Sequence, residues 1–252
     1  MTWLLTLAFD GTEYCGFQVQ PNGRSVAAAF QDGLEAVIGR RPDIKGCSRT
    51  DAGVHALGFA LSFEADLRIP PEKLPLALNT KLPRDIRVLS ARVVPDGFHA
   101  RYAAHTKTYL YRIRNSPIDS PFEERYYCRI PGRLDVERMQ RAAAHFVGTH
   151  DFLALCAAHS SAAAHGDTVR TITACGAERH GDTVEITVTA DGYLYNMVRI
   201  LAGTLCEAGA GRLDPEAVPA ILASRDRRLA GPTLPAKGLF LHHVDYGKEA
   251  EG

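Results

Sequence analysis

The sequence predicts an α+β protein made of two halves, with helices packed on one face of mainly antiparallel sheet. Segments with the alternation of strands and segments with the spacing of helices are mixed along the whole chain. No short tandem repeat or low-complexity tract interrupts them. The order of the segments breaks near residues 100–106, which indicates a first half over residues 1–104 and a second half over residues 105–252.

The first half is expected to run strand, helix, strand, helix, strand. Its predicted strands, in which apolar residues alternate or cluster, are residues 3–9, 59–63 and 86–94. The first helix is expected over residues 25–38, because Val26, Phe30 and Leu34 recur at helical spacing. Ser25 is the expected N-cap, since its hydroxyl can accept a hydrogen bond from an amide of the first helical turn.

The second half is expected to contain strands and helices in alternation. Tyr109, Tyr111 and Ile113 alternate with other residues at the period of a strand. A hairpin is expected around the turn at residues 179–182, and a mobile loop over residues 156–167. The remaining expected elements are helices over residues 134–147 and 194–209, a short helix capped by Asp214 with Pro215 at its first position, and a final strand over residues 239–244.

Composition places the chain among ordinary globular proteins with a buried core. Hydrophobic residues make up 46% and charged residues 23% of its 252 residues. No apolar run reaches the length of a membrane span. The first residues lack the basic start and the cleavage site of a signal peptide, so the cytoplasm is the expected location.

Charge and cysteine usage limit the possible partners. The 29 basic and 29 acidic residues give a formal net charge of zero, which counts against a nucleic-acid partner because such proteins usually carry a basic excess. Charge distribution, however, is not fixed by net charge. The six cysteines are scattered without a C-x-x-C pair, which favours free thiols and predicts no zinc site or other metal site.

One polar loop, residues 46–56, combines a carboxylate and a guanidinium between glycines. Gly46 and Gly53 are expected to adopt backbone conformations closed to other residues, and Thr50 to hold the turn by a local hydrogen bond. Arg49 and Asp51 would point to the same side if this stretch were extended. Taken alone, the pattern fits a surface turn with an Arg–Asp pair better than it fits a catalytic loop.

The octapeptide Arg-Thr-Asp-Ala-Gly-Val-His-Ala of residues 49–56 resembles the signature of the TruA family of pseudouridine synthases. Further segments resemble this family in the same order along nearly the whole chain. They are residues 9–20, 78–79, 85–88, 98–101, 107–111, 148–152, 168–172, 195–200, 230–233 and 238–241. Three positions depart from the family pattern, namely Cys47, Ser48 and Leu234, and the helix after Arg24 lacks the usual Thr-Val-Gln opening.

The resemblance implies two ferredoxin-like (RNP-like) halves whose sheets join, with a catalytic cleft between the halves. It implies an isomerase that converts uridine to pseudouridine at positions 38, 39 and 40 of the tRNA anticodon stem-loop. The reaction moves the uracil from an N1 to a C5 linkage without redox change, so no cofactor is expected. The partner is tRNA, and a homodimer with one tRNA spanning both subunits is implied.

The resemblance also assigns roles to three catalytic positions. Asp51 matches the catalytic aspartate, which acts as a nucleophile on the sugar, as a nucleophile on the base, or as a base toward the sugar. Tyr109 matches the tyrosine that stacks on the target base and helps to remove the C5 proton. Arg199 matches an arginine that pairs with the aspartate and keeps it ionised.

Five further residues are expected to contact the substrate. Arg49 matches the arginine that helps to evict the target base from its helix. Leu239 matches an apolar residue that packs on the flipped base, and Tyr111 is placed on the same strand face as the catalytic tyrosine. Asp10 and His55 are added because they lie in matched loops, although a lone histidine in such a loop is more often structural.

Two other functions remain open. The first is an RNA-binding protein of the same fold without catalysis, which release of tritium from C5-labelled uridine would distinguish. The second is an unrelated hydrolase that uses Asp51 with a histidine, although the sequence carries no G-x-S-x-G elbow and no metal-ligand pair.

Overall fold

The computed structural model describes residues 1–21, 23–157 and 164–250, which form two compact units. The first unit contains residues 1–106 and 240–252, and the second contains residues 107–239. The sequence placed the boundary after residue 104 and assigned the C-terminal strand to the second half. In the structure the chain returns to the first unit at Phe240. The sequence could not show this, because local patterns do not reveal which sheet a terminal strand joins.

The first unit contains a sheet with the order β4-β1-β3-β2 and antiparallel neighbours. Its strands are β1 (Thr2–Phe9), β2 (Ile44–Gly46), β3 (His55–Glu64) and β4 (Ile86–Val94). Strand β10 (Leu239–Asp245) runs parallel to β3 and pairs with the first two residues of β3. Strand β2 pairs with residues 61–63, near the other end of β3. One edge of β3 is therefore shared by two strands that are distant in the sequence.

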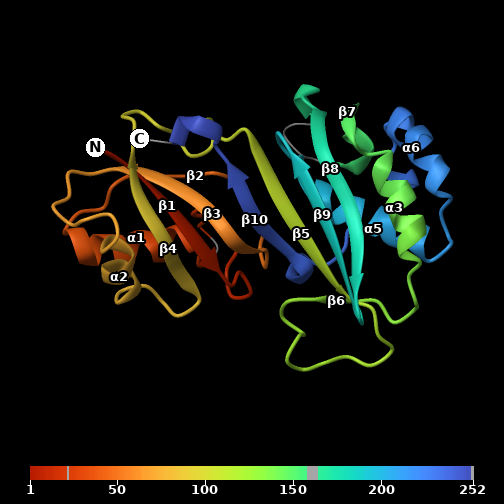
Figure 1. Cartoon of the computed structure of the whole chain (residues 1–252), viewed down its shortest axis with the longest axis horizontal. Helices are drawn as coiled ribbons and strands as arrows, with labels where there is room; N and C mark the ends of the chain where they lie inside the picture. Colours follow the sequence, from red (N-terminus) through yellow and green to blue (C-terminus); the bar gives the residue numbers. More distant parts are fainter. Residues whose placement is uncertain (22, 158–163, 251–252) are drawn as a thin grey trace. The chain divides into compact units, whose positions relative to one another are not determined.

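Two helices pack against this sheet, as Figure 1 shows: α1 (Val26–Ile38) and α2 (Leu74–Asn79). The Ser25 hydroxyl accepts a hydrogen bond from the Ala28 amide at 3.2 Å, which confirms the predicted N-cap. Gly39 ends α1 in the left-handed region, with φ of 74°. Phe17 and Phe59 stack with ring centroids 4.3 Å apart, which ties the loop after β1 to the core.

The second unit is built on strands in the order β5-β9-β8-β7, with antiparallel pairing of β9 to β5 and of β8 to β9 and β7. Strand β6 pairs parallel to β5. The bounds are β5 (Thr106–Arg114), β6 (Cys128–Arg129), β7 (Gly148–Asp151), β8 (Val169–His180) and β9 (Thr183–Ala190). The predicted hairpin of β8 and β9 is confirmed, since only Gly181 and Asp182 separate the two strands.

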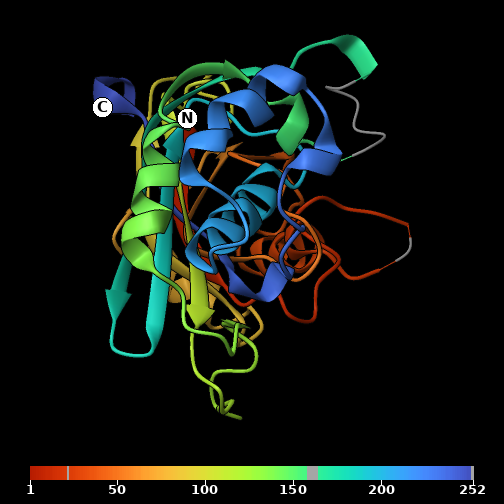
Figure 2. The ribbon, with the colours of Figure 1, turned by 90° about the vertical axis from the view of Figure 1, so that its right-hand side faces the viewer.

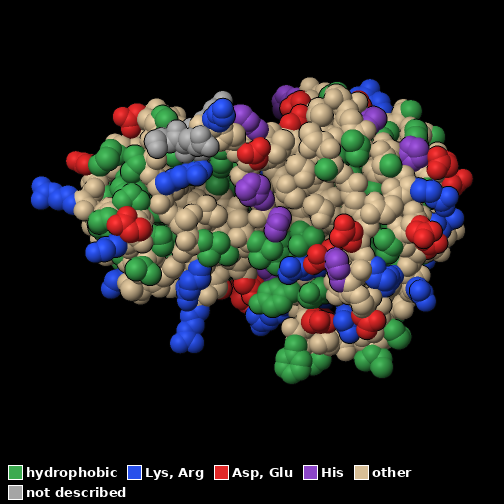
Figure 3. All heavy atoms as spheres, in the orientation of Figure 1, with side chains coloured by type: hydrophobic (Ala, Val, Ile, Leu, Met, Phe, Trp, Pro, Cys, Tyr) green, Lys and Arg blue, Asp and Glu red, His purple; other side chains and the backbone are tan. Residues whose placement is uncertain are grey.

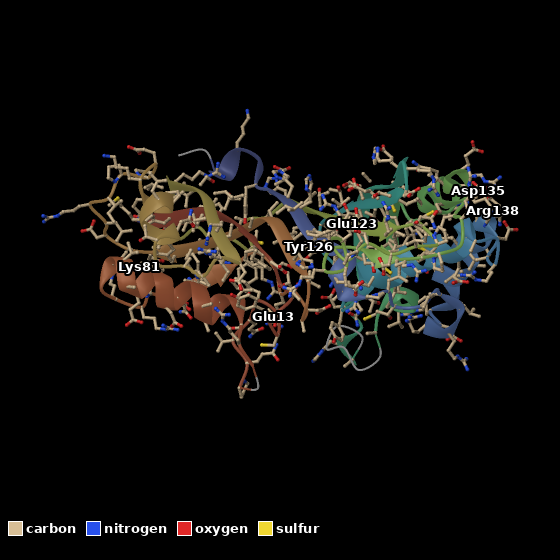
Figure 4. All side chains as sticks on the ribbon, turned by 90° about the horizontal axis from the view of Figure 1, so that it is seen from below. Glu13, Lys81, Glu123, Tyr126, Asp135 and Arg138 are labelled. Atoms are coloured by element: carbon tan, nitrogen blue, oxygen red, sulfur yellow. The ribbon has the colours of Figure 1, made fainter. Side chains whose placement is uncertain are left out.

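Helices α3 (Val136–Ala144), α5 (Met197–Gly209) and α6 (Val218–Ser224) belong to the second unit, and α3 packs on both β8 and α5 (Figure 2). Asp135 caps α3 by accepting from the Arg138 amide at 3.1 Å. The Arg138 guanidinium in turn donates to the Ala208 and Leu213 carbonyls at 2.9 and 3.0 Å. Figure 4 labels both residues at this end of α3, where they hold the end of α5.

Several predicted elements differ from the observed ones in extent. The helix expected over residues 134–147 is only the nine residues of α3, and α5 begins at Met197 because Asn196 has a positive φ of 60°. Asp214 does cap a short helix, which is a 3₁₀ turn over Pro215–Ala217 that leads into α6. Residues 158–163 lie outside the described residues, so the loop expected over residues 156–167 stays a prediction.

Charged side chains of both signs are interspersed over the second unit in Figure 3, in keeping with the zero net charge of the chain. Large apolar side chains remain exposed in the loop after β5, where Ile118 is 77% and Phe122 is 90% exposed. Among the described residues, no cysteine takes part in a disulfide. In the described ranges, every helix is too short or too polar to cross a bilayer.

Candidate active site

The loop that carries Asp51 is fixed by buried anchors on either side of it. Cys47, Thr50 and Val54 are 0%, 8% and 2% exposed. The Cys47 amide donates to the Ala60 carbonyl of β3 at 2.8 Å, and the Val54 amide donates to the Asp51 carbonyl at 3.2 Å. These anchors turn inward, whereas the Arg49 side chain is exposed and that of Asp51 is half-buried. The local fold therefore presents the carboxylate at the surface of a rigid turn.

A second loop, residues 10–17, packs against the Asp51 loop. The Phe17 amide donates to the Thr50 carbonyl, and the Gly53 amide donates to the Tyr14 carbonyl, both at 3.2 Å. The two backbones approach so closely that a Cβ added to Gly11 would meet the Val54 carbonyl group, with its carbon only 2.7 Å away. The Asp51 loop is thus positioned by backbone contacts that require glycine at residue 11.

Three expectations for the loop need correction. Gly53 has the expected positive φ of 76°, but Gly46 does not; a Cβ there would instead collide with the rings of Phe17 and Phe59. Among the described residues, the buried Thr50 hydroxyl has no hydrogen-bond partner, and it is the Thr50 carbonyl that holds the turn. Residues 47–54 are not a strand, so period-two alternation does not relate Arg49 to Asp51.

Within the described part of the chain, the Arg49 guanidinium takes part in no hydrogen bond or ion pair. An exposed arginine without an internal partner keeps its donors available for an external acceptor. It lies in the same turn as Asp51, two positions earlier in the chain. This placement fits the predicted role of Arg49 toward the substrate.

Asp10 and His55 are brought together, with the His55 ring buried and the Asp10 side chain half-buried. The His55 ring is 1% exposed and stacks on Phe240 with centroids 4.7 Å apart. Its Nδ1 accepts from the Gly11 amide at 3.0 Å and lies 3.1 Å from an Asp10 carboxylate oxygen. The ring has no exposed face for RNA, and these contacts fit a structural role for His55. Through Gly11, the pair supports the loop that packs on the Asp51 turn.

Tyr109 lies on β5 in the second unit and is 6% exposed. The edge of the Tyr193 ring packs against it, with centroids 4.9 Å apart and planes at 83°. The Tyr193 hydroxyl lies 2.7 Å from the Lys107 carbonyl and 2.8 Å from the Val188 carbonyl, one on each of the paired strands β5 and β9. Tyr193 is not among the predicted site residues, because no motif or periodicity of the sequence singles it out.

Tyr111 shares a strand face with Tyr109 but is fully buried. Its hydroxyl donates to the Pro235 carbonyl at 2.7 Å. Burial raises the pKa of this phenol far above its ordinary value, so the hydroxyl stays a donor at every physiological pH. The side chain is therefore engaged within its own unit, and the predicted contact with substrate is not what its surroundings favour.

Arg199 lies in the first turns of α5 and is held by its own unit at two points. Its Nε donates to the Leu234 carbonyl at 2.7 Å, and its Nη1 donates to the Asn196 side-chain oxygen at 2.8 Å. The Leu234 amide donates back to the Arg199 carbonyl at 3.3 Å. Residue 234 thus acts through its backbone, which explains how Leu234 can replace the usual alanine without disturbing the arginine.

Leu239, the first residue of β10, is 6% exposed. It follows Gly238, where an added Cβ would meet the Tyr111 ring at 2.9 Å and the Arg112 carbonyl at 2.8 Å. The chain therefore enters β10 by passing closely over β5. This contact explains why a glycine precedes the predicted apolar contact residue.

The family model described as tRNA pseudouridine synthase matches residues 6–103 and 142–247, which include all of the predicted site residues except Tyr109 and Tyr111. The chain belongs to this family. The matched ranges contain the whole Asp51 loop and the helix that carries Arg199. The resemblance seen in the octapeptide at residues 49–56 is thereby confirmed over most of the chain.

Curated relatives agree with this family over nearly their full length. The chain is 46% identical over 244 residues to "tRNA pseudouridine synthase A" of Moorella thermoacetica (strain ATCC 39073 / JCM 9320), which covers 96% of this chain and 98% of that protein. It is 44% identical over 243 residues to the protein of the same name from Shouchella clausii (strain KSM-K16), at 96% and 92% coverage.

Among solved structures, the "Crystal Structure of a Cbf5-Nop10-Gar1 Complex" matches with a TM-score of 0.37 and 10% identity. The match covers 94% of this chain and 57% of that one. This likeness is too distant to define the fold.

Proposed function

We propose that this protein isomerises uridine to pseudouridine at positions 38, 39 and 40 of the tRNA anticodon stem-loop. The observation that carries the proposal is the rigid Asp51 turn within a chain that matches tRNA pseudouridine synthases over residues 6–103 and 142–247. The turn offers a half-buried carboxylate together with an exposed arginine, and its backbone is fixed by the neighbouring loop.

In the proposed reaction the C1′–N1 bond of the uridine breaks and a C1′–C5 bond forms. The proton on C5 leaves and N1 gains one, so product and substrate have the same composition. Asp51 acts on the sugar or on the base as a nucleophile, or on the sugar as a base. No electrons are exchanged with a second reagent, so the proposal includes no cofactor.

The other residues hold the base and the carboxylate during this change. Tyr109 stacks on the uracil, and its hydroxyl takes part in removal of the C5 proton. Arg199 pairs with Asp51 and keeps it ionised. Arg49 fills the place of the evicted base in the anticodon stem, which its lack of an internal partner among the described residues supports. Leu239 offers an apolar surface to the uracil.

The architecture proposed for this activity is two ferredoxin-like halves whose sheets join around a catalytic cleft. The β1-α1-β2-β3-α2-β4 order of the first unit and its β4-β1-β3-β2 sheet support the first part of this proposal. We also propose a cytoplasmic homodimer in which one tRNA spans both subunits. Light scattering should then give about twice the chain mass of 27.4 kDa, and a monomeric mass at working concentration would contradict the dimer.

The direct test is a chemical map of pseudouridine in tRNA transcripts before and after incubation with the purified protein. New pseudouridines confined to positions 38–40 are expected. Binding of the transcripts without any new pseudouridine would instead favour a catalytically silent RNA-binding protein. New pseudouridines elsewhere in the tRNA would contradict the proposed site of action.

A further inference from the structure

A short segment, Gly231–Pro235 (the arginine support), lies against α5 and supplies the carbonyl that holds the Arg199 guanidinium. Its Leu234 exchanges two hydrogen bonds with Arg199, one through the guanidinium and one through the backbone. The position of the guanidinium therefore depends on where this segment is fixed along the helix.

One end of the arginine support is fixed by Thr204 on α5. The Thr204 side chain is 0% exposed, and its hydroxyl accepts from the Gly231 amide at 2.9 Å while donating to the Ile200 carbonyl at 2.9 Å. The hydroxyl thus uses its one donor and one of its two acceptor lone pairs. A valine has almost the same shape but would leave the Gly231 amide buried without an acceptor, which costs free energy.

Two glycines allow the segment to approach the helix this closely. A Cβ on Gly231 would lie 2.5 Å from the Gly203 carbonyl carbon and 2.6 Å from the Thr204 Cα. A Cβ on Gly203 would in turn meet the Pro232 carbonyl group, whose carbon is 3.0 Å away. Backbone lies directly on backbone at this point, so the hydroxyl can reach the amide.

The other end is fixed by Tyr111 on β5. Its buried hydroxyl donates to the carbonyl of Pro235, the residue that follows Leu234. The helix therefore anchors one end of the support and the strand anchors the other, with the carbonyl that binds Arg199 next to the second anchor. These two hydrogen bonds join the hydroxyls to the arginine support and not to Arg199.

We propose that Thr204 and Tyr111 are positioning residues for Arg199, acting through the arginine support. The proposal rests on the function proposed above, in which Arg199 assists the isomerisation. Small displacements of a catalytic group have large kinetic effects, of about a hundredfold for about 1 Å. Loss of either hydroxyl should therefore slow the chemical step without weakening the binding of tRNA.

The test is single-turnover release of tritium from tRNA containing C5-labelled uridine, together with the Kd for tRNA and the Tm of each variant. Thr204→Val and Tyr111→Phe should each slow release about tenfold at unchanged Kd, equivalent to ~1.4 kcal/mol in the barrier. Thr204→Ser keeps the hydroxyl and should restore the wild-type rate. Tyr246→Phe is the matched control, because the Tyr246 hydroxyl also donates to a backbone carbonyl, that of Ala100, at 2.7 Å.

A purely structural role is separated by combining each variant with Arg199→Lys. If Thr204 and Tyr111 act through Arg199, the double variants should be no slower than Arg199→Lys alone. Additive slowing, or wild-type rates for Thr204→Val and Tyr111→Phe while Arg199→Lys is slow, would overturn this inference and leave the proposed function standing. A wild-type rate for Arg199→Lys would remove the assumed role of Arg199 and this inference with it.

Discussion

Replacement of Gly11 by alanine should uncouple catalysis from binding of tRNA. The new methyl group would lie 2.7 Å from the Val54 carbonyl carbon, which is 0.7 Å short of the 3.4 Å at which ordinary contact begins. Neither side can yield easily, because the Gly11 amide is held by His55 and Val54 is buried. The Asp51 turn, which ends at Val54, should therefore be displaced by an appreciable fraction of 1 Å.

A displacement of that size predicts a loss of about tenfold to about a hundredfold in the rate of the chemical step. Overpacking should also reduce the free energy of unfolding by about 1–3 kcal/mol. The assay is single-turnover formation of pseudouridine, with the Kd for tRNA measured in parallel. The Kd should change little, because phosphate contacts supply most of the affinity for a nucleic acid.

Two alanine controls separate displacement of the turn from general damage. Gly132→Ala adds a methyl group where nothing lies within 4 Å and should be silent. Gly58→Ala creates a similar collision in β3, where the new methyl group would lie 2.5 Å from the His242 carbonyl oxygen of β10. This collision does not involve the Asp51 turn. A folded Gly11→Ala protein with wild-type turnover, or equal losses in Gly58→Ala, would refute the argument that this contact positions Asp51.

Three further outcomes follow from the structure. Arg199→Ala should reduce turnover strongly at nearly unchanged affinity for tRNA; weaker binding with unchanged turnover would indicate that Arg199 only grips RNA. Tyr109→Phe keeps the stacking ring, so binding of tRNA should persist. Tritium release should slow by about a hundredfold or more, which is the usual contribution of a general acid or base to the rate. Undiminished release would exclude the phenol from proton transfer. Ser25→Ala removes the cap of α1 and should lower the free energy of unfolding by about 1 kcal/mol in a urea titration, with turnover unaffected.

The elements that the sequence predicted well are those with a long hydrophobic period and clear end signals. The helix capped by Ser25 and the hairpin closed at Gly181 have both, and the structure confirms them. Strand β2 has only three residues, too few to show a period. The partner of β10 is a contact between distant segments, which local alternation does not encode.

The candidate site shows the same division. The loop with Asp51 stands out in the sequence because polar residues and glycines are concentrated in it. The groups that hold Arg199 and the segment beside it do not stand out, since they are backbone carbonyls, such as that of Leu234, or buried hydroxyls, such as that of Thr204. His55 shows how burial bears on such a prediction, because it lies in a functional motif of the sequence, whereas in the fold its ring is buried and accepts from the Gly11 amide.

If the carboxylate of Asp51 performs the isomerisation, its replacement by an amide in Asp51→Asn should abolish the reaction. The measurement is tritium release from tRNA labelled at uridine C5, with purified Asp51→Asn protein in excess over the tRNA. A folded protein that binds tRNA as the wild type does and releases no tritium is expected. Substantial release by this variant would show that the reaction proceeds without the carboxylate, and Asp51 would then not be the catalytic group.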